Sequence, residues 1–176
     1  EVLKQYDPEV LRYFILASHY RSPLDYSDEN LKAAKSALDG LYIALRGIAP
    51  GKAAEGEPTR RFDAALADDF NTPAALAVLF DLARAVNKAQ GDVAAAAELR
   101  ALGGKLGLLG RDPEQYLKGG TTGDLGETEI EALMMRRNEA RKNRDWAESD
   151  RIRDELKAQG VLLEDAPGGN TVWRRQ

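Results

Sequence analysis

Apolar side chains recur at helical spacing through most of this chain, and this periodicity restricts its fold more than any other feature. One stripe occupies residues 31–45 and comprises Leu31, Ala34, Leu38, Leu41, Tyr42 and Leu45. A second occupies residues 76–86 and comprises Leu76, Leu79, Leu82, Ala83 and Val86. Positions three or four apart share one face of a helix, so each stripe can be buried against a neighbouring helix. We therefore expect a mainly α fold whose first part is a helical bundle.

Short polar residues mark where these helices should begin. Asp7 precedes a proline, Ser27 precedes an acidic first turn, and Asp92 precedes an alanine-rich segment. Thr72 and Pro73 should supply the cap and first turn of the helix that carries the second stripe. Such residues accept hydrogen bonds from the unpaired amides of a first turn, or lack an amide there. The helix after Asp7 is apolar on most sides, so we expect it to be buried.

The last 50 residues follow a different pattern. Thr128 with Glu131, and Asp145 with Glu148, have the spacing of two capping boxes, which predicts two helices. Gly160 should end the second of them. After it, two strands at residues 161–165 and 171–175, joined by a turn at 166–170, are predicted to form a hairpin.

Residues 111–126 separate these two patterns, and they are rich in Gly, Thr, Asp and Pro. This composition predicts a linker between a helical bundle domain and a small α+β domain. The predicted regions are a connector at 1–26, the bundle at 27–110, the linker at 111–126 and the C-terminal domain at 127–176.

The composition excludes several classes of site. The chain has no cysteine, hence no disulfide, thiolate metal site or thiol nucleophile, and its single histidine disfavours zinc chemistry. A net charge of −4 argues against indiscriminate coating of nucleic acid, so any such contact must be local. No apolar run approaches the roughly 20 residues needed to span a bilayer, and no leader segment opens the chain. We expect a cytoplasmic monomer without membrane contact, and the start at Glu1 without an initiator methionine suggests a fragment.

Three features that resemble functional motifs have simpler structural interpretations. His19 is expected to be a half-buried corner residue hydrogen-bonded to backbone, because no serine or carboxylate partner is evident. The polar residues at 68–71 are expected to satisfy amides at a helix exit and entry rather than to bind a metal. Gly103 and Gly104 lie inside a helical pattern, which favours close helix packing over a phosphate loop.

We expect the chain to meet its partner through the segment 130–156. Arg137, Arg141 and Arg144 recur at i, i+4 and i+7, which places three guanidinium groups on one side of a helix. Trp146 should then stand at the first position of the next helix, at a corner between the two.

That second helix offers one acceptor and one set of donors on the same face. Asp150 and Arg153 are three residues apart, so they lie near the same indole plane. Two interpretations remain open from the residues alone. Either Trp146 is a hydrophobic cap and this pair a weak surface contact, or the group recognises a ligand.

Motifs along essentially the whole chain resemble the C-terminal part of cysteinyl-tRNA synthetases. The first are Tyr6-Asp7-Pro8-Glu9, Leu11-Arg12-Tyr13-Phe14 and His19-Tyr20-Arg21-Ser22-Pro23-Leu24. The bundle contributes Asp69-Phe70-Asn71-Thr72-Pro73. The tail contributes Ala140-Arg141-Lys142, Asp145, Asp150, Ile152-Arg153-Asp154, Leu156, Gly160, Leu163-Glu164-Asp165 and Trp173-Arg174-Arg175. Each piece is moderate evidence, but their order and spacing together are specific.

This resemblance implies a tRNA-binding region of cysteine–tRNA ligase that contains no catalytic residues. The connector would join it to an N-terminal catalytic domain absent from this sequence, which would hold ATP and zinc. The implied partners are tRNA(Cys) and that catalytic domain. The residues implied to touch anticodon bases are Arg141, Trp146, Asp150, Arg153 and Asp165. The residues expected to hold the tRNA backbone are Arg137, Arg144, Arg174 and Arg175.

Two alternatives predict different behaviour. A related ligase that joins cysteine to an amino sugar would share the bundle but have no use for an anticodon reader. A helical protein-interaction module would use Trp146 as an anchor, and its binding would not depend on anticodon sequence.

Overall fold

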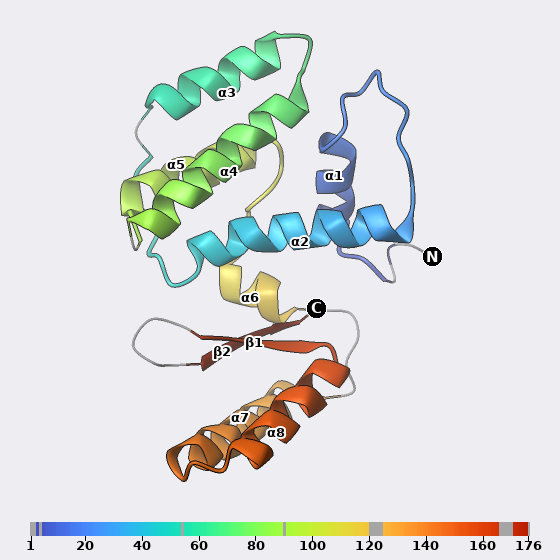
Figure 1. The fold of residues 1–176 in the computed structure, drawn as a ribbon. Coiled ribbons are helices and arrows are strands. Elements are labelled where there is room, and N and C mark those ends of the chain that lie inside the picture. Colours follow the sequence, from blue (N-terminus) through green and yellow to red (C-terminus); the bar gives the residue numbers. More distant parts are fainter. Residues whose placement is uncertain are drawn as a thin grey trace. The chain divides into compact units, whose positions relative to one another are not determined.

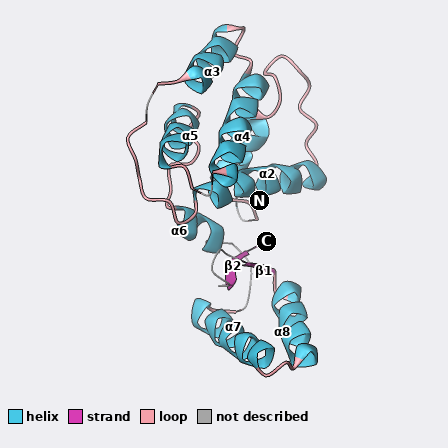
Figure 2. Ribbon diagram, turned by 60° about the vertical axis from the view of Figure 1, so that its left-hand side comes forward, coloured by secondary structure: helices cyan, strands magenta, loops and turns pink. Residues whose placement is uncertain are grey.

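The computed structural model describes residues 3, 5–53, 55–89, 91–119, 125–165 and 171–175, with backbone only at Asp165. The chain forms two compact units, Glu1–Tyr116 and Leu117–Gln176. The predicted mainly α fold is confirmed, because the described residues form helices and one small antiparallel sheet (Figures 1 and 2). None of the described helices is both long and apolar enough to cross a membrane.

The first unit is built around α4 (Thr72–Lys88). α3 (Glu57–Ala67) and α5 (Val93–Lys105) both pack against it, as does α2 (Asp28–Leu45) (Figure 1). α1 (Pro8–Leu16) packs mainly on α2. The two predicted apolar stripes are confirmed as the facing surfaces of this bundle, since every member of both is buried.

Most predicted caps are confirmed, and one is wrong. Asp7, Ser27 and Asp92 each accept a hydrogen bond from an amide of the helix that follows. The cap of α4 is Asn71, whose Oδ1 accepts from the Ala74 amide at 3.1 Å, whereas Thr72 is already the first helical residue. Asn71 and Thr72 are both common capping residues, and the sequence alone does not show which of the two precedes the first helical turn.

The cap of α3 comes from another helix, and no local sequence pattern predicts it. Gly56 precedes α3 and has no side chain to cap it. Glu98 of α5 accepts hydrogen bonds from the Gly56 amide, the Thr59 amide and the Thr59 hydroxyl at 3.3, 3.1 and 2.6 Å. This buried carboxylate therefore satisfies the first turn of α3 and joins α3 to α5.

α1 is less buried than its composition predicts. Val10, Tyr13 and Phe14 lie in the core, but Ile15 is 60% exposed. α1 packs against α2 and, less extensively, against α4, and these contacts leave Ile15 in solvent.

Glycines of the first unit divide between turn and packing roles. Gly47 lies beyond the end of α2 with φ +72°, in the left-handed region that glycine adopts at least cost. A Cβ on Gly103 would come within 2.7 Å of Leu109 Cδ1, so Gly103 is closely packed, but against the segment that follows α5 rather than against another helix as predicted. Nothing lies within 4 Å of such an atom on Gly104.

The range 111–126, predicted as a linker, contains α6 (Pro113–Lys118). Tyr116 is buried, stacks on Tyr42 with 3.8 Å between ring centroids, and donates its hydroxyl proton to Asp39 at 3.0 Å. Glu114 pairs with Arg46 at 2.5 Å. The sequence analysis missed these buried contacts because the residues on either side of α6 have a turn-forming composition. Residues 120–124 of this range lie outside the described residues.

The second unit consists of α7 (Glu127–Lys142), α8 (Trp146–Ala158) and a hairpin of β1 (Val161–Asp165) and β2 (Thr171–Arg175). α7 and α8 lie side by side (Figure 2), and the strands pair antiparallel with Leu163 opposite Trp173. The core comprises Ile130, Ile152, Leu156, Val161 and Trp173. The helix pair and hairpin are thus confirmed, while the predicted turn at 166–170 lies outside the described residues.

Of the two predicted capping boxes, the one at Thr128 is wrong. In the one at Asp145, the hydrogen bond from the Glu148 amide to the Asp145 side chain is observed. α7 begins two residues earlier than the box of Thr128 and Glu131 requires, and the Glu129 carboxylate instead accepts from the Gly126 amide at 2.9 Å. Asp145 does cap α8, accepting from the Glu148 amide at 3.1 Å. Gly160 follows α8 with φ +73°.

Replacement of Glu98 by alanine should destabilise the first unit more than removal of a surface carboxylate. The Glu98→Ala change leaves two amides and a hydroxyl without their acceptor, at an expected cost of about 1–3 kcal/mol. Urea unfolding should show this loss. The Glu57→Ala control removes an exposed carboxylate 3.6 Å from Arg61 and should cost less than about 1 kcal/mol. Equal losses for the two variants would contradict the capping role.

Alkaline pH should destabilise the first unit. Burial, and next the nearby carboxylates of Glu9 and Asp39 respectively, raise the pKa values of Tyr42 and Tyr116 above the ordinary value. Because the folded pKa values exceed the unfolded value near 10, this contribution is complete below about pH 10 and is lost as the pH rises further. Urea midpoints should therefore fall steeply above about pH 10. Tyr116→Phe should flatten that decline, and an unchanged slope would contradict the assignment.

Candidate nucleic-acid interface

The corner between α7 and α8 is a closed turn with an arginine in an unfavourable backbone conformation. The Arg144 amide donates to the Arg141 carbonyl at 3.1 Å and the Asp145 amide to the Ala140 carbonyl at 2.8 Å. These bonds form the helix-terminating motif that usually places glycine in the left-handed position. Here that residue is Arg144, with φ +60°. A side chain there costs roughly 1 kcal/mol relative to glycine.

Trp146 stands immediately after this corner as the first residue of α8, where the sequence predicted it. Its side chain is 59% exposed, whereas the other tryptophan, Trp173, is 3% exposed in the core of the same unit. The Asp145 cap fixes the first turn of α8 and thereby the position of the indole. The unit thus presents one aromatic ring to solvent at the corner of two helices.

Several of the predicted base-contacting residues lie on exposed surface near the start of α8. Asp150 and Arg153 form an ion pair at 3.1 Å, with side chains 61% and 51% exposed. Arg141 lies in the last turn of α7 and is exposed. The side chain of Asp165 lies outside the described residues.

The four arginines predicted to hold the tRNA backbone differ in their surroundings. Arg137 donates to the Thr171 hydroxyl at 3.5 Å, and Arg174 pairs with Glu164 at 2.6 Å. Arg175 donates to the carbonyls of Lys118 and Leu125 at 3.2 and 2.9 Å. Arg144 is exposed and its side chain makes no hydrogen bond or ion pair within the described part of the chain.

The predicted row of three arginines on one helix face is therefore wrong at its third member. α7 ends at Lys142, so Arg144 lies in the turn rather than two helical turns beyond Arg137. The helix ends because the Asp145 cap starts a new one, and the i, i+7 spacing does not apply across that break.

A second group at the corner was not singled out from the sequence. Glu148 of α8 accepts from Arg136 of α7 at 3.1 Å and from Arg151 at 2.7 and 2.9 Å. The hydrogen bond from Arg151, ahead of the other contributions, lowers the pKa of Glu148. Spacing on α8 could have indicated the pair of Glu148 with Arg151, but the contact with Arg136 depends on how the helices pack. This group holds the first turns of α8 against α7, next to Trp146.

The first unit brings together two motifs that the sequence left apart. Asp69, in the turn between α3 and α4, accepts from the Tyr20 hydroxyl at 2.7 Å and pairs with Arg21 at 3.0 Å. His19 Nε2 lies 3.9 Å from the same carboxylate, and its Nδ1 accepts from the Arg21 amide. The predicted backbone contact of His19 is confirmed, while its carboxylate neighbour was not anticipated.

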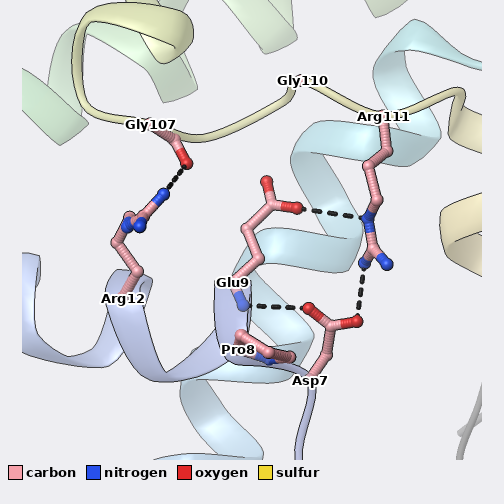
Figure 3. A pocket seen from close by; sticks show the side chains of 7 residues that line it. All are labelled: Asp7, Pro8, Glu9, Arg12, Gly107, Gly110 and Arg111. Atoms are coloured by element: carbon pink, nitrogen blue, oxygen red, sulfur yellow. Dashed lines mark hydrogen bonds and ion pairs between the residues drawn. The ribbon is translucent and has the colours of Figure 1, made fainter.

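A pocket of the first unit lies between the start of α1 and the segment before α6 (Figure 3). Arg111 pairs with Asp7 at 2.8 Å and with Glu9 at 3.5 Å, and Arg12 donates to the Gly107 carbonyl at 2.8 Å. Glu9 also accepts from the Tyr42 hydroxyl and the Leu109 amide at 2.9 and 2.7 Å. The charged groups that line the pocket already bind one another. Their contacts therefore hold α1 against α2 and against residues 107–111.

Comparison with known proteins gives three family matches along the chain. Residues 1–36 match the tRNA synthetases class I (C) catalytic domain, residues 61–110 the DALR domain, and residues 123–174 the cysteinyl-tRNA ligase anticodon binding domain. The candidate corner lies within the third match.

Full-length relatives give the same result. A protein of Thioalkalivibrio sulfidiphilus is 60% identical over 182 residues, covering 99% of this chain and 39% of the relative. Proteins of Alkalilimnicola ehrlichii and Methylococcus capsulatus are each 55% identical, covering 100% of this chain and 40% of each relative. All three are named cysteine–tRNA ligase, and the chain spans about 40% of their length. The motifs, the helical bundle with its small α+β unit, and these matches place the chain in the cysteine–tRNA ligase family.

Proposed function

We propose that this chain is the region of a cysteine–tRNA ligase that binds the anticodon of tRNA(Cys). The complete enzyme would attach cysteine to tRNA(Cys) with ATP. The observation that carries this proposal is the 59% exposure of Trp146 at the corner of α7 and α8, within the segment that matches the anticodon-binding family.

Single-stranded loop bases are recognised by stacking on aromatic rings and by hydrogen bonds to their edges. An exposed indole at a fixed helix start can accept an unstacked base on its face without disturbing the core. Asp150 and Arg153 then provide an acceptor and donors for base edges, cytosine amino groups among them. Their exposed pair is worth only about 0–1 kcal/mol, so exchanging it for contacts with bases costs little. Arg141 and Asp165 complete the proposed set.

The phosphate contacts are assigned first to Arg144. Its guanidinium is exposed and unpaired within the described residues, whereas Arg137, Arg174 and Arg175 also hold the hairpin and the segment before α7. Any phosphate contact from those three would have to add to, or replace, internal bonds. A single well-placed arginine agrees with a chain whose net charge is −4.

The chemistry of the complete ligase would be performed outside this chain. No group of three or more histidine, cysteine, aspartate or glutamate side chains with metal-binding geometry occurs among the described residues. The family resemblance implies ATP and zinc, and we propose that both bind in the remaining catalytic domain. We further propose that the protein acts as a monomer in the cytoplasm.

Removal of the indole should weaken tRNA binding without unfolding the protein. Trp146→Ala removes one stacked base contact, worth roughly 1–3 kcal/mol, so the Kd for tRNA(Cys) should rise about 5- to 150-fold. Fluorescence titration would measure the Kd, and circular dichroism the fold. Met135→Ala is the matched control, because Met135 is 67% exposed on the same unit and has no assigned role. Unchanged tRNA affinity for Trp146→Ala, or equal affinity for a tRNA with an altered anticodon, would refute the proposal.

Replacement of Arg144 by glycine should raise the stability of the protein and lower its affinity for tRNA. Arg144→Gly removes the guanidinium and relieves the left-handed backbone, so stability should rise by roughly 1 kcal/mol while tRNA affinity falls. The slope of log K against log salt should decrease by about 1. Arg144→Ala separates the two effects, since it should lose the same affinity with no gain in stability. A variant of either kind that retains full affinity and salt dependence would exclude Arg144 from the interface.

A further inference from the structure

Exposed apolar side chains are concentrated near the start of the chain. Nine large apolar side chains are exposed among the described residues, and five of them fall within residues 3–26. These five are Leu3, Ile15, Tyr20, Leu24 and Tyr26. Scattered apolar residues on a surface need no explanation, but this concentration in a short segment does.

Phe70 joins this group through the tertiary structure. Tyr20 and Arg21 hold Asp69, the residue before Phe70, at 2.7 and 3.0 Å. The loop between α1 and α2 is thereby fixed beside the turn between α3 and α4 (Figure 1). We call Ile15, Tyr20, Leu24, Tyr26 and Phe70 the apolar corner.

The backbone at Phe70 is held in a costly conformation. Asp69 and Phe70 have φ values of +51° and +50°, in the left-handed region that residues other than glycine rarely adopt. The Phe70 ring is 69% exposed, so the first unit gains little burial from it. Strain that projects an apolar ring into solvent indicates that the ring serves a contact outside this unit.

The charges around the apolar corner select the class of partner. Residues 15–29 and 68–70 carry five carboxylates, on Asp25, Asp28, Glu29, Asp68 and Asp69, and one arginine, Arg21. Such an excess of negative charge repels the phosphates of RNA. A protein surface with an apolar centre fits better, because the exposed rings can be buried there while the carboxylates remain at the rim.

We propose that the apolar corner is the surface on which the remainder of the class I catalytic domain packs. Residues 1–36, which contain four of the five side chains, match that domain family, yet the chain covers only 39–40% of the length of its relatives. Asp69 and Phe70 lie in the DALR match, so the hydrogen bond from Tyr20 joins the two matched regions. This inference rests on the proposed function, because it requires that the chain act as part of a complete ligase.

Hydroxyl-radical footprinting with mass spectrometry tests this surface directly. One sample is this chain alone, and the other is this chain joined to the preceding part of the Thioalkalivibrio sulfidiphilus relative, whose C-terminal part it matches. Oxidation of Tyr20, Tyr26 and Phe70 should fall several-fold in the joined protein. Met135 and Trp146 are exposed in the second unit and should react equally in both samples.

Addition of tRNA(Cys) separates the possible occupants. Protection of the apolar corner that appears only with tRNA would assign it to RNA and overturn the proposal, as would equal oxidation in all samples. Protection of Trp146 by tRNA tests the anticodon function independently, so the two proposals can fail separately.

A substitution at Phe70 gives a second readout. Phe70→Gly relieves the left-handed backbone, so it should raise the unfolding midpoint of the chain alone. In the joined protein the same change removes an interface side chain and should lower the midpoint. Val93→Gly, a change at another exposed apolar residue, should not produce opposite signs in the two proteins. A Phe70→Gly shift of the same sign in both would refute the interface.

Discussion

Burial of Trp173 is the interaction on which the second unit depends. The indole fills the space between the hairpin and the helix pair, against Ile130, Ile152, Leu156 and Val161. Lys118 and Arg175 lie over its ring at 5.1 and 5.8 Å, and Arg175 also holds the carbonyls of the segment before α7. The second tryptophan, placed at a helix start, remains in solvent and available to a ligand.

The arginines of this unit also differ in whether their side chains make contacts within the protein. Those on β2 lie where carbonyls and a carboxylate approach closely, and they bind these groups. Arg136 and Arg151 hold Glu148 and thus join α7 to α8. Arg144 occupies a turn in which a glycine would be less strained. Arginines of this unit therefore differ in their contacts, and only the groups that surround each one distinguish the bound side chains from Arg144.

In the first unit, two carboxylates fix the segment that matches the catalytic domain to the helical bundle. Glu9 receives the Tyr42 hydroxyl and the Leu109 amide, and Asp69 receives Tyr20 and Arg21. Glu9 is largely shielded from water, where charge-assisted hydrogen bonds are strongest. The described residues of the segment 5–36 consequently contact the bundle, even though residues 1–36 match another domain by sequence.

The sequence alone determined the helices of the bundle, because the apolar stripes at residues 31–45 and 76–86 repeat over about four and about three turns, and each defines one face to bury. It also determined the start of α8 at Trp146 and the terminal hairpin, where local capping and alternation rules apply without ambiguity. Only the tertiary structure decided that Asn71 rather than Thr72 caps α4 and that Glu98 caps α3 from another helix. It likewise decided which tryptophan is buried and that Tyr20 meets Asp69. Each of these features depends on contacts between groups distant in sequence, or on a shift of one residue in where a helix begins. Local periodicity carries no information about either.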